Sequence, residues 1–292
     1  MGSLKILTAI IPVGPMSGQL NQIFDTLKEC KSLPIEIIVV CDDHKDGTKD
    51  KLASLIGDEF PEIKLMIGEF NSPGLARNVG LSEATSPWIV FWDADDSPKP
   101  HASLQAIAEI QNSTTNLICT QYSIYDASTK NEIYSSELRT SEVKNLQAVG
   151  TQPGLWRFIF SRDLLSNLKF TPSKMGEDQE FLAQVFNRNP HVVFEDLHSY
   201  NYLVSRKGQL TEDKSNISYL IDTIEKIKGL NSKTPAKFKE CVRLMLIQMI
   251  LALLLSKNRK FKIIGFQYAL RNLFSLVRSV TTILREKKER NG

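Results

Sequence analysis

The chain has 292 residues, 42% of them hydrophobic, so it can bury a substantial core and is not expected to be disordered. Its 36 Lys and Arg exceed its 33 Asp and Glu by only three, so the net charge does not indicate a nucleic-acid partner and we expect none. The basic excess belongs to the C-terminal tail, because residues 257–292 hold ten Lys or Arg against only Glu286 and Glu289.

The four cysteines show no paired spacing typical of zinc sites or disulfide frameworks, which favours a reducing compartment. The first apolar run, Ile6–Ile11, is too short for a secretory signal. The longest uncharged stretch, Leu244–Leu255, has twelve residues, well short of the roughly 20 that span a bilayer. We therefore expect a cytoplasmic protein, either soluble or peripheral at the inner face of the membrane.

In chain order, strands and helices alternate through the first hundred residues. Four short β-branched runs are predicted to be strands: Ile6–Ile11, Glu36–Val40, Lys64–Ile67 and Trp88–Phe91. Helical composition fills the intervals at Gln19–Lys31, Lys49–Leu55 and Gly74–Ala84. This alternation predicts an α/β fold, a mostly parallel sheet with helices on both faces. Such sheets bind ligands beyond the C-terminal ends of their strands, so the residues that follow each strand are candidate site residues.

The second half of the chain changes character. Leu117–Tyr125 is predicted to be a strand, and the polar stretch from Asp126 to Asn145 supports no firm prediction. After Thr211 the chain is predicted to be helical, with a connection at Lys257–Lys260 between the last two of three segments: Tyr219–Leu230, Pro235–Leu255 and Phe261–Lys288.

An acidic run, Asp93-Ala94-Asp95, directly follows the apolar strand at Trp88–Phe91. Carboxylate oxygens are the ligands that Mg²⁺ prefers, with water and substrate phosphates completing its shell. The alternative is that Asp96 or Ser97 caps a helix opened by Pro98, and for Asp96 we expect the cap.

The acidic run resembles the Asp-x-Asp motif of the family 2 glycosyltransferases, which have the GT-A fold, a Rossmann-like mixed sheet that binds nucleotide-sugars. By match of position, the resemblance implies that Asp95 binds Mg²⁺ or Mn²⁺ and that Asp93 contacts the sugar of the nucleotide. It covers roughly residues 4–211. We therefore expect a GT-A catalytic domain over residues 1–211 and a helical extension over residues 212–292.

Two further segments resemble donor-binding motifs of that family. Asn71–Gly80 is similar to its Gly-x-Ala-Arg-Asn-x-Gly stretch, in which Arg77 could present a fork of donors to a phosphate. The alternative is a surface helix whose Arg pairs with a carboxylate. Asp42–Thr48 is similar to the loop in which Asp42 would read the nucleotide base, although residues 43–45 depart from the pattern. Pro12 begins a match to a Pro-x-Tyr stretch, but Gly14 lacks the aromatic ring.

Met175–Asp178 resembles the Gly-Glu-Asp motif, which implies that Asp178 is the catalytic base and that Glu177 lies on the acceptor side. The alternative is that both carboxylates only complement a helix N-terminus. Trp156 is similar to an aromatic residue that shapes the acceptor side, and a core position is equally expected.

The run from Tyr200 to Arg206 resembles the Tyr-x-Tyr-x-x-x-Arg tail of the family, in which Arg206 could close over the diphosphate. His198 lies close to this tail and is a candidate for a further metal ligand, although a lone histidine more commonly has a structural role.

The last predicted helix has helical spacing of apolar residues, with Arg271, Arg278 and Arg285 on another face; the apolar positions are Leu273, Val277, Val280 and Leu284. A basic amphipathic helix of this kind could bind an anionic membrane surface. It could equally pack on Leu244–Leu255 or form a homodimer contact.

Together these segments predict an inverting glycosyltransferase. It would move a hexosyl or N-acetylhexosaminyl group from a nucleoside diphosphate-sugar, with UDP as the expected nucleotide, to a hydroxyl of a glycan or lipid-linked saccharide. Cell-surface polysaccharide synthesis is the expected setting. A sugar nucleotidylyltransferase, or a non-catalytic nucleotide- or saccharide-binding module, are the alternatives.

Overall fold

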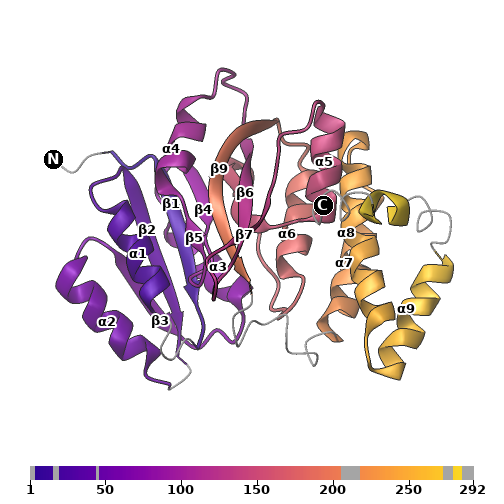
Figure 1. Cartoon of the computed structure of the whole chain (residues 1–292), viewed down its shortest axis with the longest axis horizontal. Coiled ribbons are helices and arrows are strands. Elements are labelled where there is room, and N and C mark those ends of the chain that lie inside the picture. Colours follow the sequence, from indigo (N-terminus) through magenta and orange to yellow (C-terminus); the bar gives the residue numbers. More distant parts are fainter. Residues whose placement is uncertain (1–3, 16–19, 44–45, 205–217, 272–278, 285–292) are drawn as a thin grey trace. The chain divides into compact units, whose positions relative to one another are not determined.

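The computed structural model describes residues 4–15, 20–43, 46–204, 218–271 and 279–284 (Figure 1). Arg206 and the expected domain boundary at residue 211 lie outside these residues, as do Leu273, Val277 and the side chains of Arg271, Arg278 and Arg285. The chain divides into two compact units: the first consists of Met1–Glu137, Trp156–Pro172 and His191–Ser205, and the second of Leu138–Leu155, Ser173–Pro190 and Arg206–Gly292. Two segments that the sequence analysis grouped with the α/β domain therefore belong to the second, helical unit.

The first half of the first unit is a parallel sheet. Its order β3-β2-β1-β4 combines β1 (Leu7–Val13), β2 (Ile35–Asp42), β3 (Lys64–Gly68) and β4 (Trp88–Phe91). The helices between them are α1 (Asn21–Cys30), α2 (Thr48–Glu59) and α3 (Pro73–Glu83). All seven predicted elements are confirmed, with ends that move by a few residues.

Helices cover both faces of this sheet. Alternate residues of β1, such as Ala9 and Ile11, share a core cluster with Ile23 and Leu27 of α1. Ile10 points to the other face, where its Cγ2 would clash with a Cβ placed on Gly80 of α3. Only glycine therefore allows α3 to lie this close to β1.

The sheet becomes mixed beyond β4. It continues as β4-β8-β6-β9-β5, in which β8 is antiparallel to both neighbours and β9 runs parallel to β6. The bounds of the added elements are β5 (Ser97–Pro98), α4 (Pro100–Ala108), β6 (Leu117–Asp126), β7 (Glu132–Ser135), β8 (Phe158–Ser161) and β9 (Val192–Val204). The predicted strand at Leu117–Tyr125 is confirmed as β6, whereas β5, β7, β8 and β9 were not predicted.

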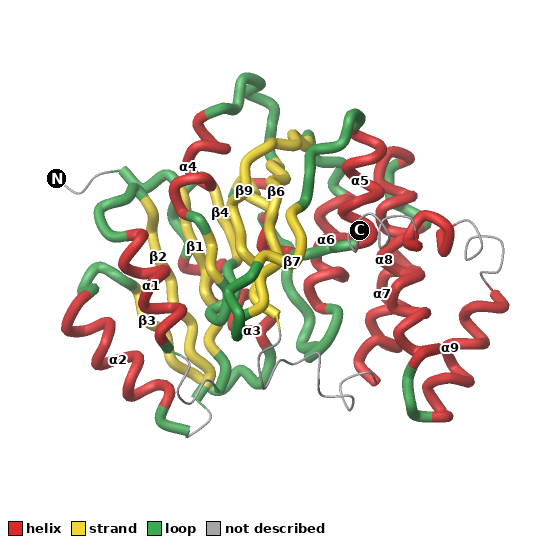
Figure 2. Tube along the Cα trace, viewed as in Figure 1, coloured by secondary structure: helices red, strands yellow, loops and turns green. Residues whose placement is uncertain are grey.

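The described part of the second unit is helical (Figure 2). It contains α5 (Glu142–Thr151), α6 (Glu177–Asn187), α7 (Tyr219–Asn231), α8 (Ala236–Leu255) and α9 (Arg259–Arg271). The connection predicted at Lys257–Lys260 is too long, because α9 already begins at Arg259. The Asn258 side chain accepts the Lys260 N–H at 2.9 Å and caps the helix there. Among the described residues, no helix is both long and apolar enough to cross a bilayer.

Candidate active site

Three neighbouring strands of the first unit end at one edge of the sheet. β1 lies between β2 and β4, with Val13 opposite Cys41 and Ile10 opposite Phe91. Asp42 therefore ends β2 at the edge where Asp93 follows β4, as the sequence predicted. Pro12 is buried in β1 opposite Val40.

Asp42 holds the loop that leads into α3. Its side chain is buried, and its two oxygens accept the backbone N–H groups of Phe70 at 2.7 Å and Asn71 at 2.8 Å. Asn71 has a left-handed backbone with φ of 55°, which such a tight loop requires. Sequence reasoning missed this role, because the two donors are backbone groups and leave no sequence signal.

Arg77 and Asp93 form an ion pair. Arg77 Nη2 donates to Asp93 Oδ1 at 2.8 Å, and the Arg77 residue is only 6% exposed. Its guanidinium also lies over the Phe170 ring, 5.6 Å from the centroid. The sequence analysis gave, as an alternative, a surface helix whose arginine pairs with a carboxylate. The pair is present, but its arginine is buried. A buried cation needs such a partner, since desolvation makes an uncompensated charge costly.

The residues around Arg77 have structural roles of their own. Asn78 clamps the backbone of Phe170, donating to its carbonyl and accepting its N–H, both at 2.8 Å. Ala76 is 2% exposed, and Gly80 meets β1. Ala76, Asn78 and Gly80 thus hold α3 in place and thereby position Arg77 relative to the strand end.

Asp96 does not cap a helix, so that prediction is wrong. α4 begins at Pro100 after Lys99, with no side-chain cap, and Asp96 is 1% exposed. The Asp96 carboxylate instead accepts the Tyr200 hydroxyl and the Leu203 N–H, both at 2.9 Å. The local pattern suggested a cap because the true partners are over a hundred residues away in the chain.

Tyr200 links the two ends of the acidic turn. Its oxygen accepts the Asp93 N–H at 3.1 Å while its hydroxyl donates to Asp96. Burial, together with the charges of Asp96 and Asp93, raises the pKa of Tyr200 well above its ordinary value. The phenol therefore stays protonated and keeps donating to Asp96 at neutral pH.

Trp156 lies in the core, one of the two positions that the sequence analysis considered. It is 7% exposed and stacks on Tyr200, with ring centroids 4.6 Å apart and 8° between the planes. The Tyr122 ring packs edge-on against Trp156, with ring centroids 4.8 Å apart. Trp156 therefore packs behind the Tyr200 phenol that holds the acidic turn.

His198 gains no support as a metal ligand. Its Nδ1 lies 3.3 Å from the Ser123 hydroxyl, and burial together with Lys99 lowers its pKa against the opposing effect of Asp196 and Glu132. Within the part of the chain that the structure describes, no three His, Cys, Asp or Glu side chains cluster to hold a cation. A cation at Asp95 would thus need water and phosphate oxygens as further ligands, which is the chemistry that Mg²⁺ accepts.

The Gly-Glu-Asp motif opens α6 in the second unit. Gly176 has φ of 83°, and a Cβ there would lie 3.1 Å from Thr223 Cγ2 of α7. Glu177 is 7% exposed, and Asp178 is half-buried with Oδ1 accepting the Gln179 N–H at 2.8 Å. Both carboxylates lie in the first helical turn, where they complement the helix dipole whatever else they do.

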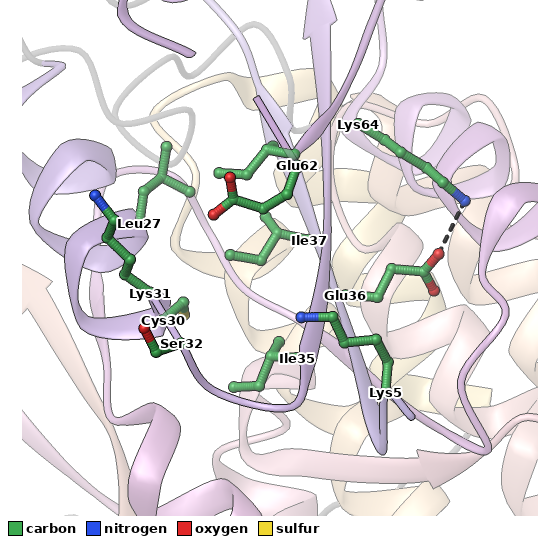
Figure 3. A pocket seen from close by; sticks show the side chains of 11 residues that line it. Lys5, Leu27, Cys30, Lys31, Ser32, Ile35, Glu36, Ile37, Glu62 and Lys64 are labelled. Atoms are coloured by element: carbon green, nitrogen blue, oxygen red, sulfur yellow. Dashed lines mark hydrogen bonds and ion pairs between the residues drawn. The ribbon is translucent and has the colours of Figure 1, made fainter. Parts of the chain in front are cut away.

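A pocket at the opposite edge of the sheet is separate from these residues. It lies where β2 and β3 begin, and Lys5, Cys30, Glu36 and Lys64 are among its lining residues (Figure 3). Glu36 accepts hydrogen bonds from Lys64 at 2.8 Å and from Thr8 at 2.6 Å. Its groups hold strands together and converge on no common point, so we assign it no ligand.

Residues 8–175, more than half of the chain, match the family model described as "Glycosyl transferase family 2". The chain belongs to glycosyl transferase family 2. The resemblance inferred from the Asp-x-Asp and Ala-Arg-Asn segments is thereby confirmed. The matched range ends one residue before Gly176.

The chain is also similar to curated proteins that are named as glycosyltransferases. Glycosyltransferase GlyA of Streptococcus pneumoniae is 24% identical over 70% of this chain and 31% of its own length. Cholesterol galactosyltransferase of Borreliella burgdorferi is 25% identical over 72% of this chain and 62% of its own length. The chain therefore spans less than two thirds of either relative.

Solved structures confirm the GT-A fold of this family 2 member. Staphylococcus aureus TarS 1–349 in complex with UDP-GlcNAc superposes with a TM-score of 0.63 at 14% identity, covering 96% of this chain and 81% of that one. The mannosyltransferase PcManGT from Pyrobaculum calidifontis, in complex with GDP-Man and Mn²⁺, gives 0.60 at 15% identity, covering 97% and 87%. The mixed sheet expected from the sequence is thus shared with both.

Proposed function

We propose that this protein is an inverting glycosyltransferase that transfers a sugar from a nucleoside diphosphate-sugar to a hydroxyl group. The observation that carries this proposal is the acidic turn at the end of β4, where Arg77 and Tyr200 hold Asp93 from two sides. Family membership supports it, as do neighbours solved with UDP-GlcNAc and GDP-Man.

The donor would bind along the strand ends of the first unit. Asp42 and Pro12 would lie against the nucleotide base, Asp93 against the sugar of the nucleotide, and Arg77 would act on the phosphates or through its hold on Asp93. Arg206, which lies outside the described residues, would bind the diphosphate. UDP is the nucleotide that we propose, carrying a hexosyl or N-acetylhexosaminyl group.

A divalent cation fits the carboxylates of the acidic turn. Asp95 would hold Mg²⁺ or Mn²⁺, and the ion would supply charge neutralisation for the departing diphosphate. Asp93 and Asp95 offer only oxygen ligands, which both ions accept.

Proton removal from the acceptor hydroxyl is assigned to Asp178. An inverting transfer needs one carboxylate that accepts this proton while the hydroxyl oxygen attacks the anomeric carbon. Gly176 and the first turn of α6 orient Asp178, and Glu177 would lie on the acceptor side. Trp156 would act indirectly, because its ring packs behind Tyr200.

The acceptor that we propose is a glycan or lipid-linked saccharide at the inner face of the membrane, within cell-surface polysaccharide synthesis. The relative named as a cholesterol galactosyltransferase supports a lipid-bearing acceptor. The family match favours sugar transfer over the nucleotidylyltransferase alternative.

Thermal unfolding with a panel of nucleoside diphosphates, each with and without Mn²⁺, tests the donor site first, because a ligand that binds the folded protein raises its stability with the logarithm of ligand concentration over Kd. We expect a metal-dependent shift with UDP that Asp95→Ala abolishes. Asp178→Asn should keep that shift and lose roughly 10²-fold or more in transfer or donor hydrolysis. Release of pyrophosphate from a nucleoside triphosphate and a sugar phosphate would instead establish the nucleotidylyltransferase, and unchanged turnover in Asp178→Asn would remove Asp178 as the base.

A further inference from the structure

Helix α9 carries apolar side chains on two opposite faces. One face packs on α8, where a Cβ on Gly265 would lie 2.8 Å from the Leu254 nitrogen, and Tyr268 on the same side is 7% exposed. At about 100° per residue, three large apolar residues fall on the other side. We call them the α9 stripe: Ile263, Phe266 and Leu270, which are 51%, 57% and 57% exposed. Water-facing apolar residues that form one row on a helix indicate a contact with a partner.

Basic residues flank this stripe. Residues 241–285 contain eight Lys or Arg and no Asp or Glu. Three of them, Arg259, Lys260 and Lys262, are exposed in the first turn of α9, and Arg259 and Lys262 lie beside the stripe in helical projection. Cations at a helix N-terminus oppose the helix dipole, so the charges add to its positive potential at a small cost in stability. A partner that carries negative charge would remove this cost.

A second copy of the chain suits the α9 stripe poorly. Two stripes packed in parallel would bring Arg259 and Lys262 of both copies together, where like charges repel, and an antiparallel pair would place these charges beside the apolar Leu270 of the other copy. Three side chains also fall far short of the roughly 800 Å² per partner that a stable dimer buries.

An anionic lipid bilayer offers what both features need. We propose that the α9 stripe docks the protein on such a bilayer, with Ile263, Phe266 and Leu270 among the upper acyl chains and Arg259 and Lys262 at the phosphates. Amphipathic helices with this combination lie in the membrane interface, and each basic residue near an anionic surface adds about 1 kcal/mol. Docking would bring the enzyme to lipid-linked acceptors, yet it needs neither donor nor acceptor. It can therefore fail while the proposed transfer stands, and the reverse.

Flotation of the full chain with vesicles tests the docking. We compare phosphatidylcholine vesicles with vesicles that also contain phosphatidylglycerol, and expect binding to the anionic ones that weakens as salt rises. The triple variant Ile263→Gln, Phe266→Gln, Leu270→Gln should bind roughly tenfold more weakly or worse, since it removes the apolar contacts. Val143→Gln, which changes a side chain that is 63% exposed on α5, should bind like the wild type.

A tryptophan probe reports which residues enter the lipid. Phe266→Trp should show blue-shifted emission, and quenching by brominated acyl chains, on anionic vesicles, whereas Val143→Trp should show neither. Equal flotation of the triple variant and the wild type, or no binding of the wild type to anionic vesicles, would overturn the proposal. Concentration-dependent dimerisation that the triple variant abolishes, without vesicle binding, would assign the stripe to a second copy instead.

Discussion

Arg77 Nη2 and Asp93 Oδ1 lie 2.8 Å apart, and the arginine end of the pair is almost fully buried while the Asp93 side chain is 31% exposed. Arg77→Ala should therefore lower the free energy of unfolding by about 2–3 kcal/mol and abolish the nucleotide-dependent rise in Tm. For Arg77→Lys, both the free energy of unfolding and the rise in Tm should lie between those of Arg77→Ala and the wild type, because lysine keeps the charge but not the planar fork. Urea unfolding gives the first quantity and thermal unfolding with UDP and Mn²⁺ the second.

An exposed ion pair provides the control for Arg77. Lys49 and Asp43 are 2.6 Å apart, with side chains 37% and 19% exposed. Lys49→Ala should lower the free energy of unfolding by much less than Arg77→Ala does, since water screens such pairs. Equal costs for Lys49→Ala and Arg77→Ala would contradict the importance of the buried pair.

Tyr200→Phe removes a single oxygen that touches both Asp93 and Asp96. We expect a loss of about 1–3 kcal/mol in unfolding free energy, because a buried carboxylate loses a donor. The Mn²⁺ concentration that gives half-maximal UDP binding should rise, since the acidic turn loses its link between the two residues. Titration of Mn²⁺ by calorimetry at fixed UDP measures this effect.

Tyr125→Phe is the matched change, because the Tyr125 hydroxyl also donates to a carboxylate, that of Glu132 at 2.8 Å, but at an exposed site. It should alter neither stability nor Mn²⁺ dependence measurably. If Tyr200→Phe behaves like Tyr125→Phe in the Mn²⁺ titration, Tyr200 only fills the core.

Gly176→Ala combines two costs, the left-handed backbone and the contact with α7. Gly47 has nearly the same φ, 81° against 83°, yet a Cβ there would have nothing within 4 Å. Gly47→Ala should therefore cost about 1 kcal/mol from backbone strain alone, and Gly176→Ala more. Unfolding free energies give the difference, which isolates the packing against Thr223 and Leu220.

The two glycines should also differ in catalysis. Gly176→Ala should reduce kcat with little change in UDP affinity, because the proposed base Asp178 lies two residues away. Gly47→Ala, in the loop matched to nucleotide binding, should leave kcat at saturating donor unchanged and can alter only UDP affinity. A kcat for Gly176→Ala equal to that of the wild type would mean that Asp178 needs no support from α7.

Glu36 makes stability depend on acid pH. Burial alone would raise its pKa, but hydrogen bonds from Lys64, Thr8 and Thr85 outweigh burial and lower the pKa from 4.5 to about 2. The unfolded chain therefore takes up the proton first as pH falls. The stabilisation is complete above about pH 4.5 and disappears progressively towards pH 2. After a discount for solvent screening of this partly exposed group, the loss is about 1–2 kcal/mol.

Unfolding free energy measured against pH tests this assignment. Glu36→Gln should be less stable at neutral pH and should lose less stability between pH 4.5 and 2. Glu225→Gln, at a side chain that is 53% exposed beside Lys228, should follow the wild-type profile. Parallel profiles for Glu36→Gln and the wild type would refute the role of Glu36.

The sequence predicted what depends on local pattern. Apolar runs such as Trp88–Phe91 became strands because the period and the flanking turns specify them without reference to the rest of the chain. Asp42 at the end of β2 and Asp93 after β4 lie at the same edge of the sheet, because the ends of neighbouring parallel strands share an edge.

What the sequence could not predict depends on distant partners. Asp96 looked like a cap, but a tyrosine over a hundred residues later takes its carboxylate. The resemblance assigned Asp42 to the nucleotide base, yet both of its oxygens accept backbone N–H groups, those of Phe70 and Asn71. The grouping of α5 and α6 with the C-terminal helices likewise arises from packing against α8 and α7, which no local pattern encodes.

The packing of Gly176 on α7 makes a matched motif depend on residues outside the matched segments. A chain shortened to residue 211 would keep every motif that we could match to the family. It would lack Thr223 and Leu220, against which the start of α6 rests. The family match stops at residue 175, so it includes neither Gly176 nor the helix that supports it. Residues 212–292 thus contribute to the conformation of the Gly-Glu-Asp segment, although none of the matched motifs lies within them.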